Sequence, residues 1–306
     1  MPTILEHLNW AWKMRRHLAL ARGVLDTPPI RPRNDGVVLF SMLGSRAVLP
    51  YLVAVKSLHH QLGRGRVEIL DDGSLTAADR RTLAHHCGDP VIHHIDAVDT
   101  GPCPRGGTWE RLLTILDLRS ADYIVQIDSD TVTCGAVPEV AAAIEAGRSF
   151  TIRGEADAQL MPINAFVAQL PIEAPPLHIQ KASERCLDAL ALPQLPAPRY
   201  VRGCAGFTGL APSGDGRALA EAFSIAMEAR LGAARWGEWG TEQVTSNFLI
   251  ANTPDPMLLP YDRYLNFWNE APPADARLVH YVGTYRFHGT SYMRATRTAT
   301  AALSAA

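Results

Sequence analysis

The sequence YIVQIDSDTV at residues 123–132 joins an apolar run to a pair of aspartates. Four of the five residues 123–127 are apolar, which is typical of a buried strand. Asp128 and Asp130 follow, and side chains two positions apart on a strand point to the same side. Two carboxylates held this close repel each other unless a cation lies between them. The pattern predicts a site for a hard divalent cation, with a simple turn closed by Asp and Ser as the alternative.

The chain around this stretch alternates between strand and helix patterns from residue 36 to about residue 153. This alternation predicts an α/β fold with a mostly parallel central sheet and helices on both faces. Ligands of such sheets bind at the carboxyl ends of the strands. The polar residues at two such ends are Asp71, Asp72, Asp128, Ser129 and Asp130. The expected strands are 36–42, 67–70, 91–95, 123–127 and 149–153, and the expected helices include 47–61 and 108–118.

The second half of the chain is less regular. The proline-rich segment 171–199 reads as a connection, and residues 199–211 read as a buried strand whose glycines indicate either a bulge or the close approach of a ligand. Trp236 and Trp239, flanked by glycines, are either core residues or part of a lid or platform for an acceptor sugar. We expect Thr241 to cap the following helix.

Composition narrows the function classes. The 306 residues are enough for one large α/β domain, and 47 % of them are apolar, which supports a sizeable core. A net charge of −2 argues against nucleic acid as the main partner. The five cysteines include no C-x-x-C pair, which favours a reducing cytoplasm and argues against a structural zinc site. The high Ala and Arg content suggests a bacterial source.

Residues 4–22 combine leucines and tryptophans with lysine and arginine. Such a segment is either an ordinary helix packed on the domain or a basic amphipathic helix in peripheral contact with the inner membrane. No apolar run is long enough for a signal peptide or a membrane span. At the other end, an Ala/Thr-rich tail after about residue 295 is expected to be frayed.

Four segments together resemble a known family. TWERLLTILDL with the Asp-x-Asp stretch after it, ILDDGSLTAADRRTL, TEQVTSN and VHYVGTYRF are similar, in this order, to motifs of GT-A fold glycosyltransferases. The closest resemblance is to the retaining family of glycogenin and the bacterial lipopolysaccharide galactosyl- and glucosyltransferases, glycosyltransferase family 8. The resemblance implies a metal-dependent hexosyltransferase that uses a nucleotide diphosphate sugar, UDP-sugar above all, and a hydroxyl acceptor on a glycan, lipid or small molecule, with retention.

The resemblance also implies a domain plan. Residues 1–35 would form an N-terminal helical extension, residues 36–290 a single GT-A catalytic domain, and residues 291–306 a tail. Within the catalytic domain, 36–153 would be the nucleotide-binding half and 154–290 the half that meets the sugar and the acceptor.

The family's functional residues map onto this sequence one by one. Asp128, Asp130 and His280 would bind Mn²⁺ or Mg²⁺, and Gly283 and Arg286 would approach the diphosphate, with arginine in the place of the family's lysine. Glu242 and Gln243 would be the catalytic pair beside the reacting sugar carbon. The remaining donor-binding candidates are Ser41, Asp71, Asp72, Arg111, Ser129 and Cys204.

Two departures from the family pattern concern the donor. Ser41 lies where the family has an acidic pair after its first strand, and Cys204 takes the place of the family's sugar-binding asparagine. These departures leave open a catalytically inactive sugar-nucleotide-binding protein. A second alternative is a haloacid dehalogenase-type phosphatase with Asp128 as nucleophile. That family normally places the motif on its first strand and needs a downstream basic residue and acidic pair, which this sequence does not offer.

Overall fold

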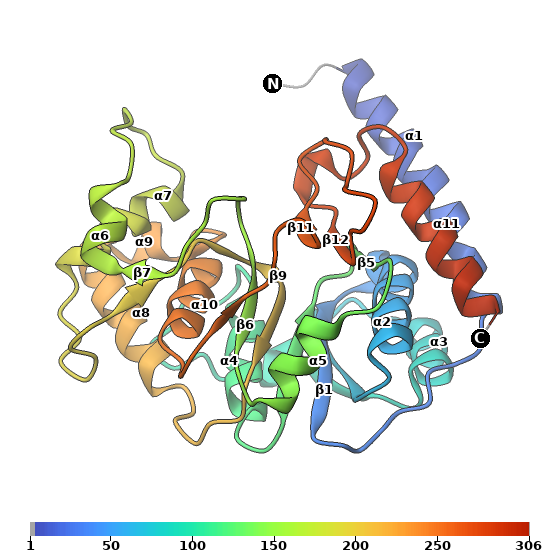
Figure 1. The fold of residues 1–306 in the computed structure, drawn as a ribbon, viewed down its shortest axis with the longest axis horizontal. Helices are drawn as coiled ribbons and strands as arrows, with labels where there is room; N and C mark the ends of the chain where they lie inside the picture. Colours follow the sequence, from blue (N-terminus) through green and yellow to red (C-terminus); the bar gives the residue numbers. More distant parts are fainter. Residues whose placement is uncertain (1–3, 306) are drawn as a thin grey trace. The chain divides into compact units, whose positions relative to one another are not determined.

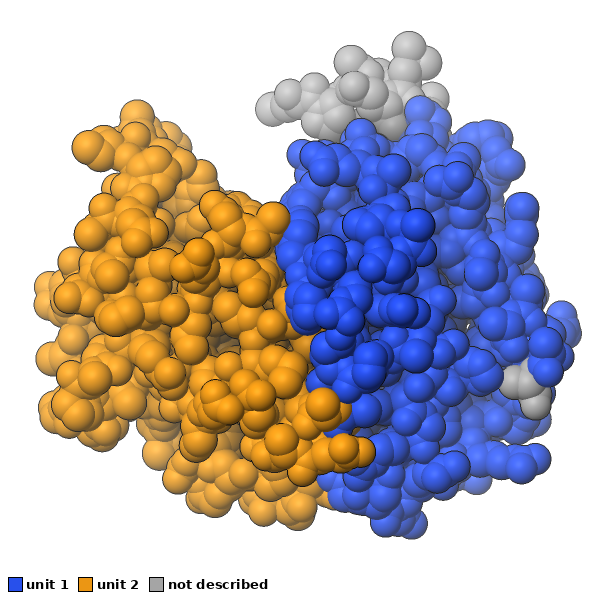
Figure 2. Space-filling model, viewed as in Figure 1, with its two compact units in different colours: residues 1–93, 127–141, 260–306 blue, residues 94–126, 142–259 orange. Residues whose placement is uncertain are grey.

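The computed structural model describes residues 4–305 and divides into two compact units (Figures 1 and 2). Unit 1 contains residues 1–93, 127–141 and 260–306, and unit 2 contains residues 94–126 and 142–259. Residues 1–3 of the predicted N-terminal extension and Ala306 of the predicted tail lie outside the described residues. Each unit is therefore built from segments that are distant in the sequence.

Unit 1 contains three strands of the central sheet, in the order β1-β2-β3. β1 and β2 pair in parallel, with Leu43 opposite Asp71 at their carboxyl ends. Both strands are almost entirely buried, as their continuous apolar runs predict. The strands are β1 (Val37–Leu43), β2 (Arg66–Asp71) and β3 (Val91–His94), and the helices between them are α2 (Val48–Leu62) and α3 (Ala77–Cys87).

The ends of these two helices follow from local chemistry. Thr76 and Asp79 form the predicted capping box at the start of α3. Gly63 ends α2 and Gly88 ends α3, both in the left-handed conformation that glycine adopts without a steric cost. The capping box fixes the end of the loop after β2, which carries Asp71 and Asp72.

A smaller sheet in unit 1 follows the Asp-x-Asp stretch. Its order is β11-β12-β5, with β12 parallel to β11 and antiparallel to β5. The backbone N–H of Thr133 on β5 donates to the Ser57 hydroxyl of α2 (3.1 Å). The strands are β5 (Thr131–Thr133), β11 (Tyr264–Asn266) and β12 (Leu278–His280).

The two ends of the chain form a pair of helices in unit 1. α1 (Ile4–Ala21) and α11 (Ser291–Ser304) lie side by side (Figure 1), and both contact α2. The expectation of a frayed tail is wrong, because Tyr292, Thr296, Ala299 and Leu303 recur at helical spacing and are all buried. The small side chains of Thr296 and Ala299 let α1 and α11 approach closely.

Unit 2 contains four strands of the central sheet, in the order β10-β6-β9-β4. β6 is parallel to β10 and antiparallel to β9. Behind them lies an aromatic core in which the Phe223 and Phe248 rings stack at 4.2 Å and Trp236 meets Phe223 edge-on. The strands are β4 (Tyr123–Ile127), β6 (Phe150–Arg153), β9 (Gly203–Leu210) and β10 (Met257–Leu258), and the helices are α4 (Trp109–Leu118), α8 (Ala218–Leu231), α9 (Ala233–Trp236) and α10 (Thr241–Ala251).

Two details of unit 2 differ from expectation. The connection at residues 171–199 contains a helix and a short turn of 3₁₀ helix, because its apolar residues Ile179 and Leu187 are buried. Thr241 begins α10 but does not cap it: Gly240 holds that position, and the Thr241 hydroxyl donates to the Glu238 carbonyl (3.1 Å).

The remaining elements are α5 (Pro138–Glu145), β7 (Met161–Pro162), α6 (Ile163–Ala168), α7 (Ile179–Glu184) and β8 (Arg199–Tyr200), with 3₁₀ helices η1 (Arg22–Asp26), η2 (Ser45–Ala47), η3 (Ile95–Ala97), η4 (Leu187–Ala189) and η5 (Gly283–Tyr285).

The predicted fold class is confirmed, because the chain has a mostly parallel central sheet with helices packed against it. Among the described residues, no helix is both long and apolar enough to cross a bilayer.

Candidate active site

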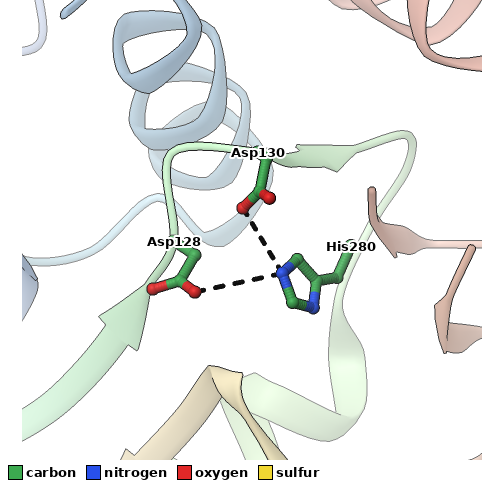
Figure 3. Close-up of side chains that lie close together, drawn as sticks. All are labelled: Asp128, Asp130 and His280. Carbon is green, nitrogen blue, oxygen red and sulfur yellow. Dashed lines mark ion pairs between the residues drawn. The ribbon is translucent and has the colours of Figure 1, made fainter. Parts of the chain in front are cut away.

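Asp128, Asp130 and His280 come together in unit 1 (Figure 3). One ligand atom from each lies within 4.8 Å of the others. His280 Nε2 is 3.3 Å from Asp130 Oδ1 and 3.9 Å from Asp128 Oδ2. Two carboxylates and an imidazole are ligands that suit Mn²⁺ or Mg²⁺. The residues therefore fit a divalent cation by their chemistry and their spacing.

Strand pairing explains how residues so far apart in the sequence meet. β12 pairs with β5 so that His280 lies opposite Thr131, the residue after Asp130. The backbone N–H of Tyr281 also donates to the Asp130 carbonyl (2.8 Å). This short ladder fixes the histidine beside the two aspartates.

Asn266 orients the histidine ring. It lies opposite His280 on β11, and its Oδ1 accepts a hydrogen bond from His280 Nδ1 (2.8 Å). Nε2 is then the ring nitrogen that faces the carboxylates, an arrangement common among metal-binding histidines. The sequence reasoning missed Asn266, because an asparagine at the end of a three-residue strand carries no motif of its own.

Asp130 is the buried centre of the cluster, with 6 % of its surface exposed. Burial raises the pKa of its carboxyl, but the nearby His280 and Arg286 outweigh burial and lower the pKa to about 2. Arg286 forms an ion pair with Asp130 Oδ2, and its Nε donates to the Tyr281 carbonyl (3.1 Å). The carboxylate is thus ionised at neutral pH, and a cationic side chain already lies against it.

Arg286 reaches Asp130 from the turn after β12. Gly283 begins η5 with a φ of 51°, in the left-handed region that glycine adopts readily. A Cβ at this position would meet no atom within 4 Å, so the glycine serves the turn rather than a tight contact within the protein. Ser129, the residue between the two aspartates, is half-buried.

A second group of predicted residues meets in unit 2. Arg111 on α4 forms an ion pair with Glu242 on α10 (3.1 Å), and both side chains are buried. The two helices are joined at the same place by a hydrogen bond from Trp109 Nε1 to the Thr241 hydroxyl (3.0 Å). Thr108 also donates to Glu242 Oε2 (3.1 Å). The structure therefore brings Arg111 and Glu242 together, and their roles at the donor stay predictions.

Thr108 is the second residue that the sequence reasoning missed. Its φ of 74° is uncommon for a β-branched residue. It follows Gly106 and Gly107, which also have positive φ, and strained backbone of this kind gathers at functional sites. The sequence GGT before the helix was the available signal.

Gln243 and Cys204 lie near each other through the backbone of β9. Gln243 is half-buried on α10, and its Oε1 accepts a hydrogen bond from the Ala205 N–H (3.4 Å). Cys204, the preceding residue, is buried. The predicted sugar-facing residues thus share one corner of unit 2 with Glu242.

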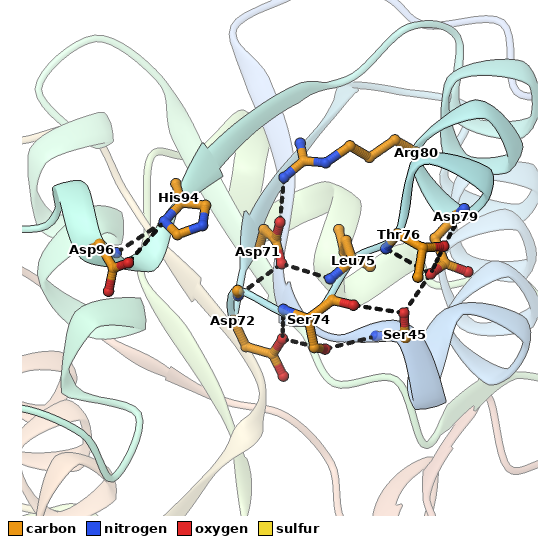
Figure 4. A network of polar contacts seen from close by, with 11 residues as sticks. Ser45, Asp71, Asp72, Ser74, Leu75, Thr76, Asp79, Arg80, His94 and Asp96 are labelled. Atoms are coloured by element: carbon orange, nitrogen blue, oxygen red, sulfur yellow. Dashed lines mark hydrogen bonds and ion pairs between the residues drawn. The ribbon is translucent and has the colours of Figure 1, made fainter.

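The side chain of Asp71 is hydrogen-bonded within its own loop (Figure 4). Its Oδ1 accepts hydrogen bonds from the N–H groups of Gly73 (2.8 Å) and Leu75 (3.2 Å), and its Oδ2 pairs with Arg80. The side chain is almost fully buried. These contacts show a structural role for Asp71, and its donor contact stays a prediction.

Asp72 and Ser41 differ in their access to solvent. Asp72 is exposed, and its Oδ1 accepts hydrogen bonds from the Ser74 N–H (2.9 Å) and hydroxyl (2.6 Å). A Cβ on Gly44 would lie 2.2 Å from the Asp72 carboxylate, so only glycine allows this approach. Ser41 is buried and donates to the Ile127 carbonyl (2.6 Å). A donor contact by Ser41 would require exchange of that hydrogen bond.

The two tryptophans before α10 have opposite environments. Trp236 is fully buried and belongs to the core, where its Nε1 donates to Ser224 (2.9 Å). Trp239 is 69 % exposed. Unit 2 also contains a cavity of about 410 Å³ whose lining combines apolar residues such as Phe166 with polar ones such as Gln169 and Arg202.

Comparison with known proteins supports the fold only. No protein-family model matches the chain. No curated protein matches its sequence.

Solved structures match by shape at low identity. The apo structure of WbbM, described as a bifunctional glycosyltransferase, aligns with 91 % of this chain at 13 % identity and a TM-score of 0.50, and this chain spans 53 % of that one. An active-site mutant of LgtC aligns with 87 % of this chain and 95 % of its own at 12 % identity, with a TM-score of 0.50. The apo structure of mouse xyloside xylosyltransferase 1 covers 81 % and 97 % of the two chains at 10 % identity, with a TM-score of 0.43. The central sheet and its helices thus have the arrangement of the GT-A glycosyltransferase fold.

Proposed function

We propose that this protein is a metal-dependent glycosyltransferase. It transfers a hexose from a nucleotide diphosphate sugar, most simply a UDP-sugar, to a hydroxyl acceptor, with retention at the anomeric carbon. The observation that carries the proposal is the group of Asp128, Asp130 and His280 on a GT-A fold. The sequence predicts the two aspartates as metal ligands, and the family resemblance implies His280 as the third.

The metal group suits the departure of a nucleoside diphosphate. Asp128, Asp130 and His280 would hold Mn²⁺ or Mg²⁺, which supplies neutralisation of the charge on the diphosphate leaving group. Arg286, on the turn that begins at Gly283, would add a planar cationic donor to the same phosphates. Both features act on the leaving group rather than on the acceptor.

The unit 2 residues suit the sugar. Glu242, held by Arg111 and Thr108, would orient sugar hydroxyls or stabilise positive charge at the anomeric carbon. Gln243 would face the sugar as a neutral polar group, with Cys204 close by in place of the family's asparagine. We assign the acceptor to residues 155–275, a range that contains all the residues lining the 410 Å³ cavity.

The alternatives explain fewer observations. A haloacid dehalogenase-type phosphatase would use Asp128 as a nucleophile, but it would leave His280 and its partner Asn266 without a role. A catalytically inactive sugar-nucleotide-binding protein would still use the metal group to bind the nucleotide sugar, but it would not transfer the sugar. The experiment below separates the phosphatase from the other two, and a transfer assay then separates those.

We also propose that the enzyme works in a reducing compartment, the cytoplasm, with its N-terminal basic helix in peripheral contact with a membrane. The five cysteines at positions 87, 103, 134, 186 and 204 are all free in the described part of the chain. A nucleotide sugar donor suits the same compartment.

The test is thermal unfolding with UDP, GDP, CDP and dTDP, each with and without Mn²⁺. A ligand at 100 times its dissociation constant stabilises the folded state by about 2.7 kcal/mol, which corresponds to a rise of several degrees in Tm. We expect one diphosphate to raise Tm only when Mn²⁺ is present. No rise with any nucleotide would refute the proposal.

Asp130→Asn provides the matched variant, because it preserves shape and removes the charge. We expect it to abolish the metal-dependent rise in Tm. Asp26→Asn, at an exposed carboxylate of η1, is the control and should behave like the wild type. A full metal-dependent response in Asp130→Asn would remove the metal group from the proposal.

A further inference from the structure

The paired terminal helices of unit 1 expose a row of arginines. On α1 and η1 the exposed side chains follow helical spacing and include Trp12, Arg15, Arg16 and Arg22. On α11 the exposed side chains include Arg294 and Arg297. We call these six residues the basic helix face.

The basic helix face has a charge opposite to that of the chain as a whole. Residues 4–26, which form α1 and η1, contain four basic residues and two acidic ones, Glu6 and Asp26, and residues 291–304 contain two arginines and no acidic residue, whereas the net charge of the chain is −2. Among the side chains that the structure describes, those of residues 9–283 and 285–305, no ion pair neutralises these arginines. The positive charge is therefore concentrated on one pair of helices and is available to a partner.

Aromatic side chains lie within and beside this charge. Trp12 is 54 % exposed, and the Arg16 guanidinium lies 4.6 Å from the centre of its ring. Trp10 is 40 % exposed and contacts Phe287 edge-on at 5.3 Å. Tryptophans and arginines are the residues that sit at the boundary between lipid headgroups and acyl chains.

Phe287 connects this face to the turn that carries Arg286. The same turn holds Tyr285, whose exposed ring meets Trp268 edge-on at 5.7 Å. A partner that covers the basic helix face would thus lie near a turn of the candidate active site within unit 1.

We infer that the basic helix face docks on the anionic surface of a lipid bilayer. Arginines attract the acidic headgroups, and the tryptophans enter the interface between headgroups and acyl chains. A nucleic acid would use the arginines but give no role to Trp10 and Trp12, so the bilayer accounts for more of the surface.

The test is sedimentation of the full chain with lipid vesicles, without donor or metal. We expect binding to vesicles that contain phosphatidylglycerol, none to pure phosphatidylcholine, and loss of binding at high salt. Each arginine near an anionic surface contributes about 1 kcal/mol, so Arg15→Gln/Arg297→Gln should weaken binding on the order of 30-fold. Trp12→Ala should weaken vesicle binding still more, and this loss of binding should remain measurable at high lipid concentration.

The matched control is Arg31→Gln/Arg81→Gln, which removes two exposed arginines of unit 1 outside the basic helix face. It should bind as the wild type does. Equal losses in the two double variants, no binding to phosphatidylglycerol vesicles, or equal affinity for duplex DNA would overturn the inference. None of these results depends on glycosyl transfer, so the membrane inference and the proposed activity can fail separately.

Discussion

At the residue scale, two cations would bind the same carboxylate, that of Asp130. Arg286 pairs with it in the structure, and the proposed cation would bind to the same group. Two cations that share one carboxylate compete unless one of them moves. The diphosphate offers Arg286 another anionic partner, so metal and nucleotide should favour each other's binding.

This competition gives Arg286→Ala two effects of opposite sign. Removal of the guanidinium should strengthen the binding of Mn²⁺ alone, because Asp130 loses a competing cation. It should weaken the affinity for UDP in the presence of Mn²⁺ by about 1.5–3 kcal/mol, as for a charged hydrogen bond. Isothermal titration with Mn²⁺ and then with UDP measures both.

Arg286→Lys serves as the control, since it keeps the charge and loses only the planar fork. It should lie between the wild type and Arg286→Ala in both titrations. If Arg286→Ala left both affinities unchanged, the arginine would have no part in the site. If it weakened Mn²⁺ binding, the competition itself would be wrong.

The same residues show how far sequence reasoning can reach. Asp128 and Asp130 are separated by one residue, so their proximity needs no tertiary information, but they lie in the turn between β4 and β5 and not on a strand. The proximity of His280 depends on the β5–β12 ladder, so only the family resemblance could suggest it. Asn266 acts through the ring of His280 and leaves no pattern in one sequence, whereas the two glycines before Thr108 are the signal of its strained turn.

At the scale of single elements, α3 depends on a local signal at its start. The Thr76 hydroxyl accepts from the Asp79 N–H (3.2 Å), and the Asp79 carboxylate accepts from the Thr76 N–H (2.9 Å). These contacts satisfy backbone donors that the first turn of a helix leaves without partners. The loop that carries Asp71 and Asp72 leads directly into this turn.

Thr76→Ala should therefore lower the free energy of unfolding by about 1 kcal/mol, the usual cost of a lost helix cap. Urea denaturation monitored by circular dichroism measures the change. Thr82→Ala is the control, because Thr82 is a half-buried residue of the same helix whose hydroxyl donates to the Ala78 carbonyl (3.0 Å) and takes no part in the cap. Equal losses in the two variants would show that the cap contributes nothing specific.

The sequence predicts those elements whose signals lie within one turn of the chain. It does not predict those that depend on contacts with another helix or strand. The capping box of α3 was readable because both residues lie within one turn. The tail was misjudged because its buried positions include only two large side chains, Tyr292 and Leu303. Thr296 and Ala299 stabilise α11 only through the close approach of other helices, which composition does not reveal.

At the scale of the whole molecule, the first and last helices close unit 1 through His17. This histidine is buried on α1, and its Nε2 forms a hydrogen bond with Thr296 of α11 (3.0 Å). Its ring stacks on Tyr292 at 3.8 Å. A protonated imidazole is disfavoured there, because burial and then the charge of Arg286 lower the pKa of His17 from 6.5 to about 4.

The sign of the pH dependence follows from this shift. The unfolded chain takes up a proton at His17 near pH 6.5, whereas the folded chain does so only near pH 4. The contribution to stability is thus complete above pH 6.5 and is lost as the pH falls from 6.5 toward 4. At pH 5 the loss from this histidine should be about 2 kcal/mol relative to pH 7.5.

Urea denaturation at pH 7.5 and at pH 5 tests this for the wild type, His17→Gln and the control His60→Gln, which changes an exposed histidine of α2. His17→Gln should lose about 2 kcal/mol less than the wild type between the two pH values, because glutamine has no proton to take up. His60→Gln should follow the wild type. Since other groups titrate equally in all three proteins, only the difference reports on His17. An identical loss in His17→Gln would mean that the contact between the two chain ends does not sense protons.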